Sequence, residues 1–151
     1  MKNFDTVEAI LDFAIKAEIE AFEFYKDLAS KVESPTMKQV FLDFADEELE
    51  HKAKLEKSKA KKSLGPTHRN IPDMKISEYT ADVEPTANMD YQSALILAMK
   101  REQKACQLYR DLAEIAESEP AKQTFLVLAE EEAKHKLRFE TEYDQVVLKE
   151  D

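Results

Sequence analysis

The chain has 151 residues, 36% of them charged and one of them glycine, and its formal net charge is −10 at pH 7. This length is sufficient for one domain with a sizeable core, and the scarcity of glycine favours long helices with solvated outer faces. The acidic balance argues against a nucleic-acid partner, and no apolar run approaches the roughly 20 residues of a membrane span. The single cysteine, Cys106, excludes an internal disulfide and a metal centre built from several thiolates.

A first helix is predicted to run to about Val32, with Asn3 or Asp5 as its N-cap. Glu18 lies inside the apolar stripe of this helix. The stripe consists of Val7, Ile10, Leu11, Ala14, Ala21, Phe22, Tyr25, Leu28 and Ala29, spaced mostly three or four residues apart. Because helical periodicity begins at Phe4, without the basic start and apolar segment of a signal peptide, we expect a cytoplasmic protein.

A second helix is predicted to begin near Pro35, a residue suited to a first helical turn. One side of it combines apolar residues with Glu48 and His51. Positions three apart are neighbours on a helix, so this carboxylate and this imidazole lie side by side. The apolar members of the same side are Met37, Val40, Phe41, Phe44 and Leu55.

A connection is predicted from about residue 62 to 88, because this segment holds the only glycine and three of the five prolines. It includes one short helical piece around Ile76–Ala81, and we expect His68 to be a solvated loop residue. A third helix follows from about Met89 to Ala116, and a fourth from about Pro120 to Leu148. The sequence thus predicts one all-α domain over residues 1–151, with helical hairpins at about 3–60 and 89–148.

The two predicted hairpins are copies of one another. Placing residues 11–56 on residues 95–140 without a gap gives 21 identities in 46 positions. Glu48 and His51 recur as Glu132 and His135, and Glu18 recurs as Glu102. The chain is therefore predicted to be a four-helix bundle made of two repeated hairpins.

The repeat also separates candidate ligands from the many other acidic residues, since a symmetric site needs a ligand from each copy. Three acidic residues fail this condition; the mismatched pairs are Glu20 and Lys104, Glu23 and Gln107, and Glu50 and Lys134. Glu47 and Glu131 do recur, but they lie at the edge of the apolar stripe. We expect them either to support the ligands or, as the favoured interpretation, to be merely solvated.

The six recurring residues should meet at one level of the bundle, because they lie at similar distances from the turns of their antiparallel hairpins. Each unpaired buried carboxylate costs several kcal/mol, against a domain stability of about 5–15 kcal/mol. Two divalent cations would balance the four carboxylates. The sequence therefore predicts a site for two metal ions, with Glu18, Glu48, His51, Glu102, Glu132 and His135 as ligands.

This pattern resembles the ferritin-like di-iron carboxylate proteins, and among them the rubrerythrins, over nearly the whole chain. That family takes one Glu from each of two helices and Glu-x-x-His from each of the other two. The resemblance implies that Glu18 and Glu102 are terminal ligands and that Glu48 and Glu132 bridge the metals. One histidine would bind each metal. The resemblance also favours a homodimer, in which the long crossover would permit an exchange of hairpins between the two chains.

Two departures from the rubrerythrins matter for function. Their further Glu, one turn after the third-helix ligand and associated with peroxidase chemistry, is Ala105 here, with Ala21 as its copy. The Cys-rich rubredoxin domain of full-length rubrerythrins is missing from this sequence. Peroxidase activity is therefore in doubt, and electrons would come from an external donor such as a rubredoxin-like protein.

Three further residues lie near the predicted centre. Tyr25 and Tyr109 follow Glu18 and Glu102 by two helical turns, so each hydroxyl either donates to a ligand carboxylate or is bonded elsewhere in the core. Cys106, whose copy is Phe22, is expected to be a small core residue rather than a redox group.

Carboxylate and imidazole ligands suit iron or manganese, with zinc as a further alternative. The leading functional hypothesis is a di-iron oxidoreductase that reacts with O2 or hydrogen peroxide. The resemblance to the rubrerythrins implies a role in oxidative stress. One alternative is a ferroxidase that handles iron. Another is a structural or interaction bundle that its metals only stabilise.

Overall fold

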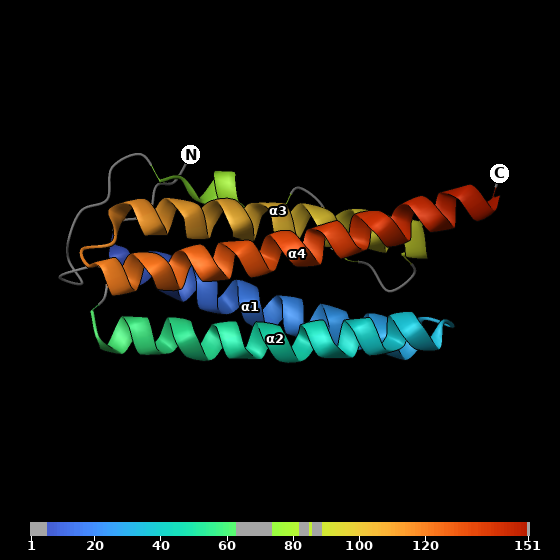
Figure 1. Ribbon diagram of the computed structural model, residues 1–151, viewed down its shortest axis with the longest axis horizontal. Coiled ribbons are helices and arrows are strands. Elements are labelled where there is room, and N and C mark those ends of the chain that lie inside the picture. Colours follow the sequence, from blue (N-terminus) through green and yellow to red (C-terminus); the bar gives the residue numbers. More distant parts are fainter. Residues whose placement is uncertain (1–5, 63–73, 82–84, 86–88, 151) are drawn as a thin grey trace.

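The structure, a computed structural model, describes residues 6–62, 74–81, 85 and 89–150. Its described long helices pair into two antiparallel hairpins that lie side by side along one axis (Figure 1). The elements are α1 (Val7–Lys31), α2 (Pro35–Ala60), the short 3-10 helix η1 (Ile76–Tyr79), α3 (Tyr91–Ile115) and α4 (Glu119–Glu150). The predicted all-α four-helix bundle is confirmed.

Polar side chains begin the helices by accepting hydrogen bonds from backbone N–H groups of the first turn. Those at α1, α2, α3 and α4 are Thr6, Ser34, Asp90 and Ser118, with distances of 3.1, 3.2, 2.8 and 3.2 Å. Pro35 stands in the first turn of α2, as predicted. The prediction of Asn3 or Asp5 as the cap of α1 is wrong, because Thr6 fills that position and both residues precede the described chain.

The hairpins pack so that α1 faces α3 and α2 faces α4. In Figure 1, α2 and α3 run in the same direction, which is why a long crossover must join them. The described part of this crossover includes η1, close to the helical piece predicted there. Tyr79 of η1 is buried and donates a hydrogen bond of 2.6 Å to Asp111 of α3, so this part of the crossover is attached to the bundle.

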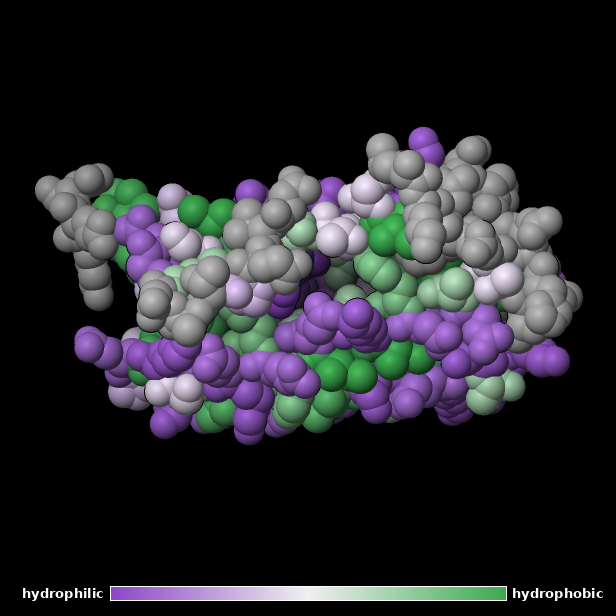
Figure 2. Space-filling model, turned by 180° about the vertical axis from the view of Figure 1, so that it is seen from behind, coloured by the Kyte–Doolittle hydropathy of each residue, from purple (hydrophilic) through white to green (hydrophobic). Residues whose placement is uncertain are grey.

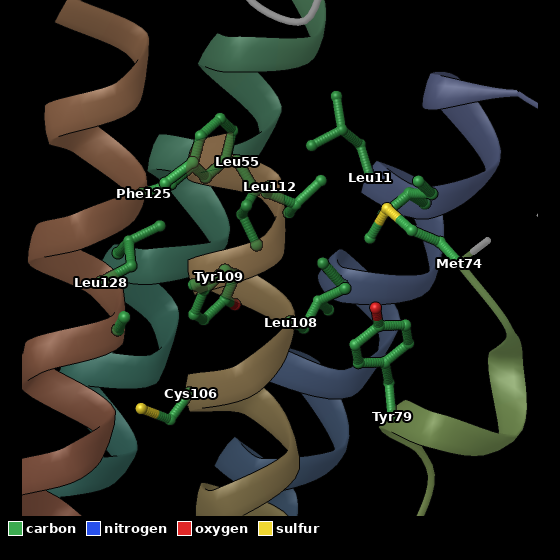
Figure 3. Close-up of a cluster of buried hydrophobic side chains, with 14 of the residues drawn as sticks. Leu11, Leu55, Met74, Tyr79, Cys106, Leu108, Tyr109, Leu112, Phe125 and Leu128 are labelled. Atoms are coloured by element: carbon green, nitrogen blue, oxygen red, sulfur yellow. The ribbon is translucent and has the colours of Figure 1, made fainter. Parts of the chain in front are cut away.

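The interior contains two clusters of apolar side chains, one toward each end of the bundle. The first apolar cluster, partly drawn in Figure 3, includes Val7, Ile10, Leu11, Ala14, Leu55, Met74, Tyr79, Cys106, Leu108, Tyr109, Leu112, Phe125 and Leu128. The second apolar cluster includes Ala21, Phe24, Tyr25, Leu28, Met37, Phe41, Ala45, Leu95, Leu97, Ala98 and Phe139. Along every long helix, the predicted ligand residues fall between the positions belonging to these clusters.

The amphipathic character of the helices agrees with a bundle in water, since their charged faces are exposed and their apolar faces are buried. Among the residues that the structure describes, no helix combines the length and the apolarity needed to cross a lipid bilayer.

Candidate metal centre

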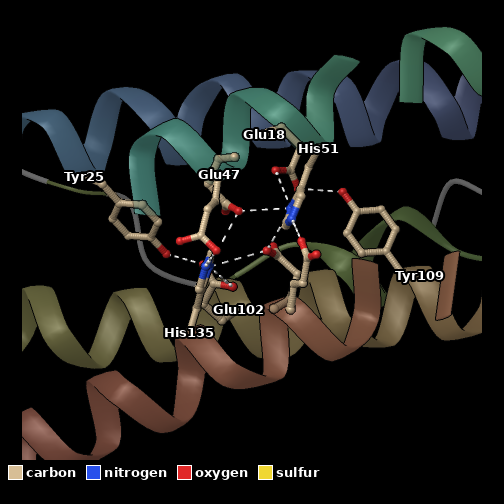
Figure 4. Close-up of polar contacts among 10 residues, drawn as sticks. Glu18, Tyr25, Glu47, His51, Glu102, Tyr109 and His135 are labelled. Atoms are coloured by element: carbon tan, nitrogen blue, oxygen red, sulfur yellow. Dashed lines mark hydrogen bonds and ion pairs between the residues drawn. The ribbon is translucent and has the colours of Figure 1, made fainter. Parts of the chain in front are cut away.

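The structure brings the six predicted ligand residues together between the two apolar clusters (Figure 4). Each of these residues is at most 2% exposed. They come from all four long helices: Glu18 from α1, Glu48 and His51 from α2, Glu102 from α3, and Glu132 and His135 from α4.

These residues form two overlapping groups, each with donor atoms within 4.8 Å of one another. The group that we call position 1 consists of Glu18, Glu48, His51 and Glu132, and position 2 consists of Glu48, Glu102, Glu132 and His135. Glu48 and Glu132 belong to both groups. Two carboxylates shared in this way suit a pair of neighbouring cations, since each carboxylate has one oxygen for each ion.

In both positions the inner nitrogen of the histidine, Nδ1, faces the carboxylates. His51 Nδ1 lies 3.1 Å from one oxygen each of Glu48 and Glu132, and 3.4 Å from Glu18 Oε2. The corresponding distances from His135 Nδ1 to Glu48, Glu102 and Glu132 are all 3.6 Å. Donor atoms about 2.0–2.2 Å from one cation lie roughly 3.0–3.5 Å apart, so this spacing suits a cation between them.

Unsatisfied buried atoms support the same interpretation. Within the described chain, no hydrogen-bond partner is found for one oxygen of each of the four carboxylates, nor for Nδ1 of either histidine. Buried polar atoms are normally paired, because leaving one unpaired costs about 1–3 kcal/mol, and more for a charged group. These six unpaired oxygen and nitrogen atoms face one another, which fits a site built for metal ions.

The electrostatics of the cluster show how closely its charges are crowded. Burial, followed by repulsion from Glu132, raises the pKa of Glu48 well above its ordinary value. Burial and the charge of Glu102 raise the pKa of Glu132 to about 8. Burial lowers the pKa of His51, but the close carboxylates of Glu132 and Glu18 outweigh it and raise that pKa to about 11. Such crowded carboxylates favour either bound protons or bound cations.

The two tyrosines connect the hairpins at this level. Tyr109 donates a hydrogen bond of 2.5 Å to Glu18 Oε1, and Tyr25 donates one to Glu102 Oε1. Each hydroxyl therefore supports a carboxylate of the opposite hairpin, which decides between the two alternatives left open by the sequence. The other oxygen of each of these glutamates is the unsatisfied one that faces the histidines.

Glu47 and Glu131 lie next to the histidines, and the favoured prediction that they are merely solvated is wrong. Glu131 Oε2 is in hydrogen-bond contact with His51 Nε2, and Glu47 Oε1 lies 3.5 Å from His135 Nε2. Each reaches across to the neighbouring hairpin between α2 and α4, which explains its place at the edge of its own apolar stripe. The sequence feature that could have indicated this role is the recurrence of the two glutamates at matching positions of the two hairpins.

A cavity of about 270 Å³ between α1 and α3 reaches the four ligand glutamates. Its walls include the small side chains of Ala21 and Ala105, which are copies of one another in the repeat. Arg101 also lines it, with its guanidinium carbon 5.1 Å from the centre of the Phe24 ring. Seen from behind the view of Figure 1, hydrophilic side chains border a recess near the middle of the molecule (Figure 2).

The remaining predicted residues do not join the cluster. Cys106 is buried in the first apolar cluster, as expected of a core residue, and burial raises the pKa of its thiol. His68 lies outside the described residues. Homodimer formation and hairpin exchange stay predictions.

Comparison with known proteins agrees with this architecture. A sequence model of the rubrerythrin family matches residues 9–143. A crystal structure from Thermotoga maritima, named as a candidate ferritin-like di-iron carboxylate protein, is 19% identical with a TM-score of 0.83, covering 97% of this chain and 99% of that one. A hypothetical protein from Pyrococcus furiosus is 30% identical with a TM-score of 0.73, covering 91% and 88%. No curated protein matches the sequence.

Proposed function

This chain belongs to the rubrerythrin family, and on that premise we propose that its six-residue cluster binds two metal ions, most simply iron, that react with O2 or hydrogen peroxide. The observation that carries this proposal is the set of unpaired oxygen and nitrogen atoms that face one another in positions 1 and 2. Oxygen and imidazole donors suit iron and manganese, and they accept zinc.

The roles of the residues follow from their places in the cluster. Glu48 and Glu132 would hold both ions, since each belongs to both positions. Glu18 and His51 would complete position 1, and Glu102 and His135 would complete position 2. When bound as ferrous iron, the pair would supply two electrons, which with two protons reduce one hydrogen peroxide to two waters.

Residues around the ligands would keep this centre in shape. The hydroxyls of Tyr25 and Tyr109 orient Glu102 and Glu18 by donating to the oxygens that do not face the histidines. The apolar clusters on both sides exclude water from the ends of the site. Hydrogen-bonded ligands in a largely apolar setting are typical of sites that control the reactivity of a metal.

The cavity between α1 and α3 favours a reaction with a small molecule over a purely structural metal site. It reaches all four glutamates, while neither histidine lines it. Its volume of about 270 Å³ exceeds that of a small molecule such as O2 or peroxide, since a water molecule occupies roughly 30 Å³ in the liquid. A ligand could therefore approach from the carboxylate side, where Ala21 and Ala105 leave room.

Repeated turnover would need electrons from outside the cluster, because its described neighbours include no second redox group: Cys106 is a buried thiol in the apolar core. We propose an external reductant, such as a small rubredoxin-like electron-transfer protein.

The test is to load metal-free protein with ferrous iron under anaerobic conditions and then add substoichiometric hydrogen peroxide or O2. We expect two irons per chain and the oxidation of two ferrous ions per peroxide consumed. A variant with both Glu48→Gln and Glu132→Gln should lose bound iron and this reaction. Glu50→Gln is the matched control, since Glu50 is exposed on the same helix.

The outcomes separate the possible functions. Retention of many irons per chain would favour iron handling instead. Two tightly bound irons that consume neither oxidant would favour the structural alternative and contradict the proposal.

A further inference from the structure

The two metal positions have closely matched ligands but unequal surroundings. The ligand glutamates, the histidines and the tyrosines that support Glu18 and Glu102 all recur in the two hairpins. If these groups acted alone, the internal repeat would make the two positions equivalent. The differences lie in what each histidine contacts on its outer side.

His51 has a carboxylate partner at its outer nitrogen. Its Nε2 is in hydrogen-bond contact with Glu131 Oε2, and the Glu131 side chain is 31% exposed. With Nε2 in contact with this carboxylate, Nδ1 is the nitrogen left to face Glu18, Glu48 and Glu132. A carboxylate on the outer nitrogen fixes the orientation of the ring and increases the basicity of the imidazole toward a metal ion.

His135 is supported less well on its outer side. Its Nε2 lies 3.5 Å from Glu47 Oε1, on a side chain that is 41% exposed, and has no hydrogen-bond partner among the described residues. Its ring instead stacks on Phe44, with centroids 3.9 Å apart and an interplanar angle of 21°. The copy of Phe44 in the repeat is Leu128, which has no ring to stack.

The inner sides of the histidines differ in the same direction. His51 Nδ1 lies 3.1–3.4 Å from its three carboxylates, whereas His135 Nδ1 lies 3.6 Å from each of its own. Stacking on Phe44 holds the ring of His135 in place but supplies no acceptor for its Nε2. Position 1 is thus arranged for a cation before the cation arrives, and position 2 less so.

We infer that the two positions fill in sequence, position 1 before position 2, and that Glu131 is the positioning residue that makes the difference. This inference depends on the proposed function only in that the cluster must bind metal. Supporting carboxylates of this kind typically change metal affinity by 10–100-fold. We therefore expect the first metal equivalent to bind at least tenfold more tightly than the second.

The test uses manganese(II) alone, titrated into metal-free full-length protein and followed by electron paramagnetic resonance and calorimetry. Below one equivalent, the spectrum should show an isolated manganese ion. The spectrum of a spin-coupled pair should develop mainly between one and two equivalents. His135→Ala should keep the tighter step, and His51→Ala should lose it.

Glu131→Ala and Glu47→Ala form a matched pair, because the two residues are copies of one another and both are partly exposed. Glu131→Ala should weaken the first step by 10-fold or more, so that the two steps merge. Glu47→Ala should leave the first step unchanged and alter the second less than threefold. Glu131→Gln should restore part of the affinity, because its amide oxygen still accepts a hydrogen bond from His51.

The possible failures are distinguishable. A coupled-pair spectrum at the lowest additions, or a loss of the tighter step in Glu47→Ala rather than in Glu131→Ala, would overturn the inference of ordered filling while leaving metal binding intact. If no manganese or iron bound at all, the proposed function itself would fail. Circular dichroism of each variant checks that the helices are kept.

Discussion

The metal centre and the two apolar clusters beside it occupy the same bundle but contribute to it in opposite ways. Phe41 and Phe125, which are copies of one another, lie fully buried in the second and first clusters. Burying each such ring stabilises the fold by about 1.5–3 kcal/mol. Between them, four carboxylates and two imidazoles are buried with unpaired atoms, which destabilises the fold unless a cation pairs them.

This contrast shows how the molecule tolerates a destabilising layer. Each apolar cluster contributes one tyrosine hydroxyl to the centre, Tyr109 from the first and Tyr25 from the second. The clusters therefore provide the stability of the bundle and also fix the orientation of two ligand carboxylates. If this division holds, changes to the phenylalanines of the clusters should alter stability without altering metal content. Changes to the ligands should remove the metals and, with them, only the part of the stability that depends on bound metal.

Truncation of a cluster phenylalanine should have the largest effect on stability. Phe125→Ala is expected to lower the free energy of unfolding by about 3–5 kcal/mol, because it removes buried area and leaves a cavity. Phe41→Ala should lower the free energy of unfolding by at least as much. The centre of the Phe41 ring lies 5.8–6.4 Å from the ring centres of Tyr25, Tyr91 and Phe139, and these aromatic contacts would also be lost. Urea denaturation followed by circular dichroism measures both.

The iron content of the folded fraction provides the control for these variants. It should stay at the value of the unmodified protein, because both side chains belong to the apolar clusters and neither is one of the six ligands. A loss of less than about 1 kcal/mol would contradict the role given to the clusters.

Removal of the metals should have the next largest effect. A ligand that binds only the folded state at 100–1,000 times its dissociation constant stabilises it by about 3–4 kcal/mol. Chelation should therefore lower the unfolding free energy by about that amount, most of it from the ion in the tighter position. The double variant Glu48→Gln, Glu132→Gln should be insensitive to chelator, and an equal response in both proteins would contradict metal binding at this cluster.

The metal-free protein should lose stability as the pH rises. Burial and the charge of Glu102 raise the pKa of Glu132 from 4.5 to about 8, so the folded state keeps a proton that the unfolded chain releases near pH 4.5. The stabilising effect of this proton is complete below that value and is lost as the pH rises toward about 8. The pKa of His135 is raised to about 9, where attraction to Glu102 outweighs burial, and it acts in the same direction.

We expect the free energy of unfolding of the metal-free protein to decrease on the order of 2 kcal/mol between pH 5 and pH 8. This decrease is smaller than the full pKa shift of Glu132 would give, because neighbouring carboxylates compete for the same protons. Thermal unfolding of chelated protein across this range measures it. Metal-loaded protein should lack the decrease, and a stability that rises with pH in the chelated protein would contradict the crowding of charge in the centre.

The sequence predicted the bundle and the six clustered residues because the internal repeat supplied a second copy with which to test each acidic position. Helical spacing alone states which side of a helix a residue occupies. It does not state which neighbouring helix that residue meets. For this reason the sequence could place Tyr25 near the centre. Only the structure shows that its hydroxyl donates to Glu102 of the opposite hairpin rather than to Glu18 of its own helix.

The same limit explains the error over Glu47 and Glu131. Both lie at the edge of the apolar stripe, where solvent and a neighbouring helix are equally compatible with the pattern. Packing of α2 against α4 turns them toward the histidines of the opposite hairpin. The N-cap of α1 was misplaced for a different reason: Asn3, Asp5 and Thr6 all have suitable side chains within four positions.

The smallest predicted effect concerns the tyrosine hydroxyls that connect the clusters to the centre. Tyr25→Phe and Tyr109→Phe should each lower the stability of metal-loaded protein by about 1 kcal/mol, because one buried hydrogen bond is lost while the carboxylate keeps its cation. The two losses should be equal within error, since each tyrosine meets the corresponding glutamate of the opposite hairpin. Urea denaturation measures both losses, and metal affinity should fall with them, because Glu18 and Glu102 become less well oriented.

Tyr91→Phe is the control for these two variants. Its hydroxyl donates a hydrogen bond of 2.8 Å to Glu142, outside the centre, and the side chain is only half-buried. This variant should cost less than about 0.5 kcal/mol and leave metal affinity unchanged, because solvent replaces the lost bond. An equal decrease in metal affinity in all three variants would mean that the aromatic core, rather than the hydroxyls of Tyr25 and Tyr109, determines how the ligand carboxylates are held.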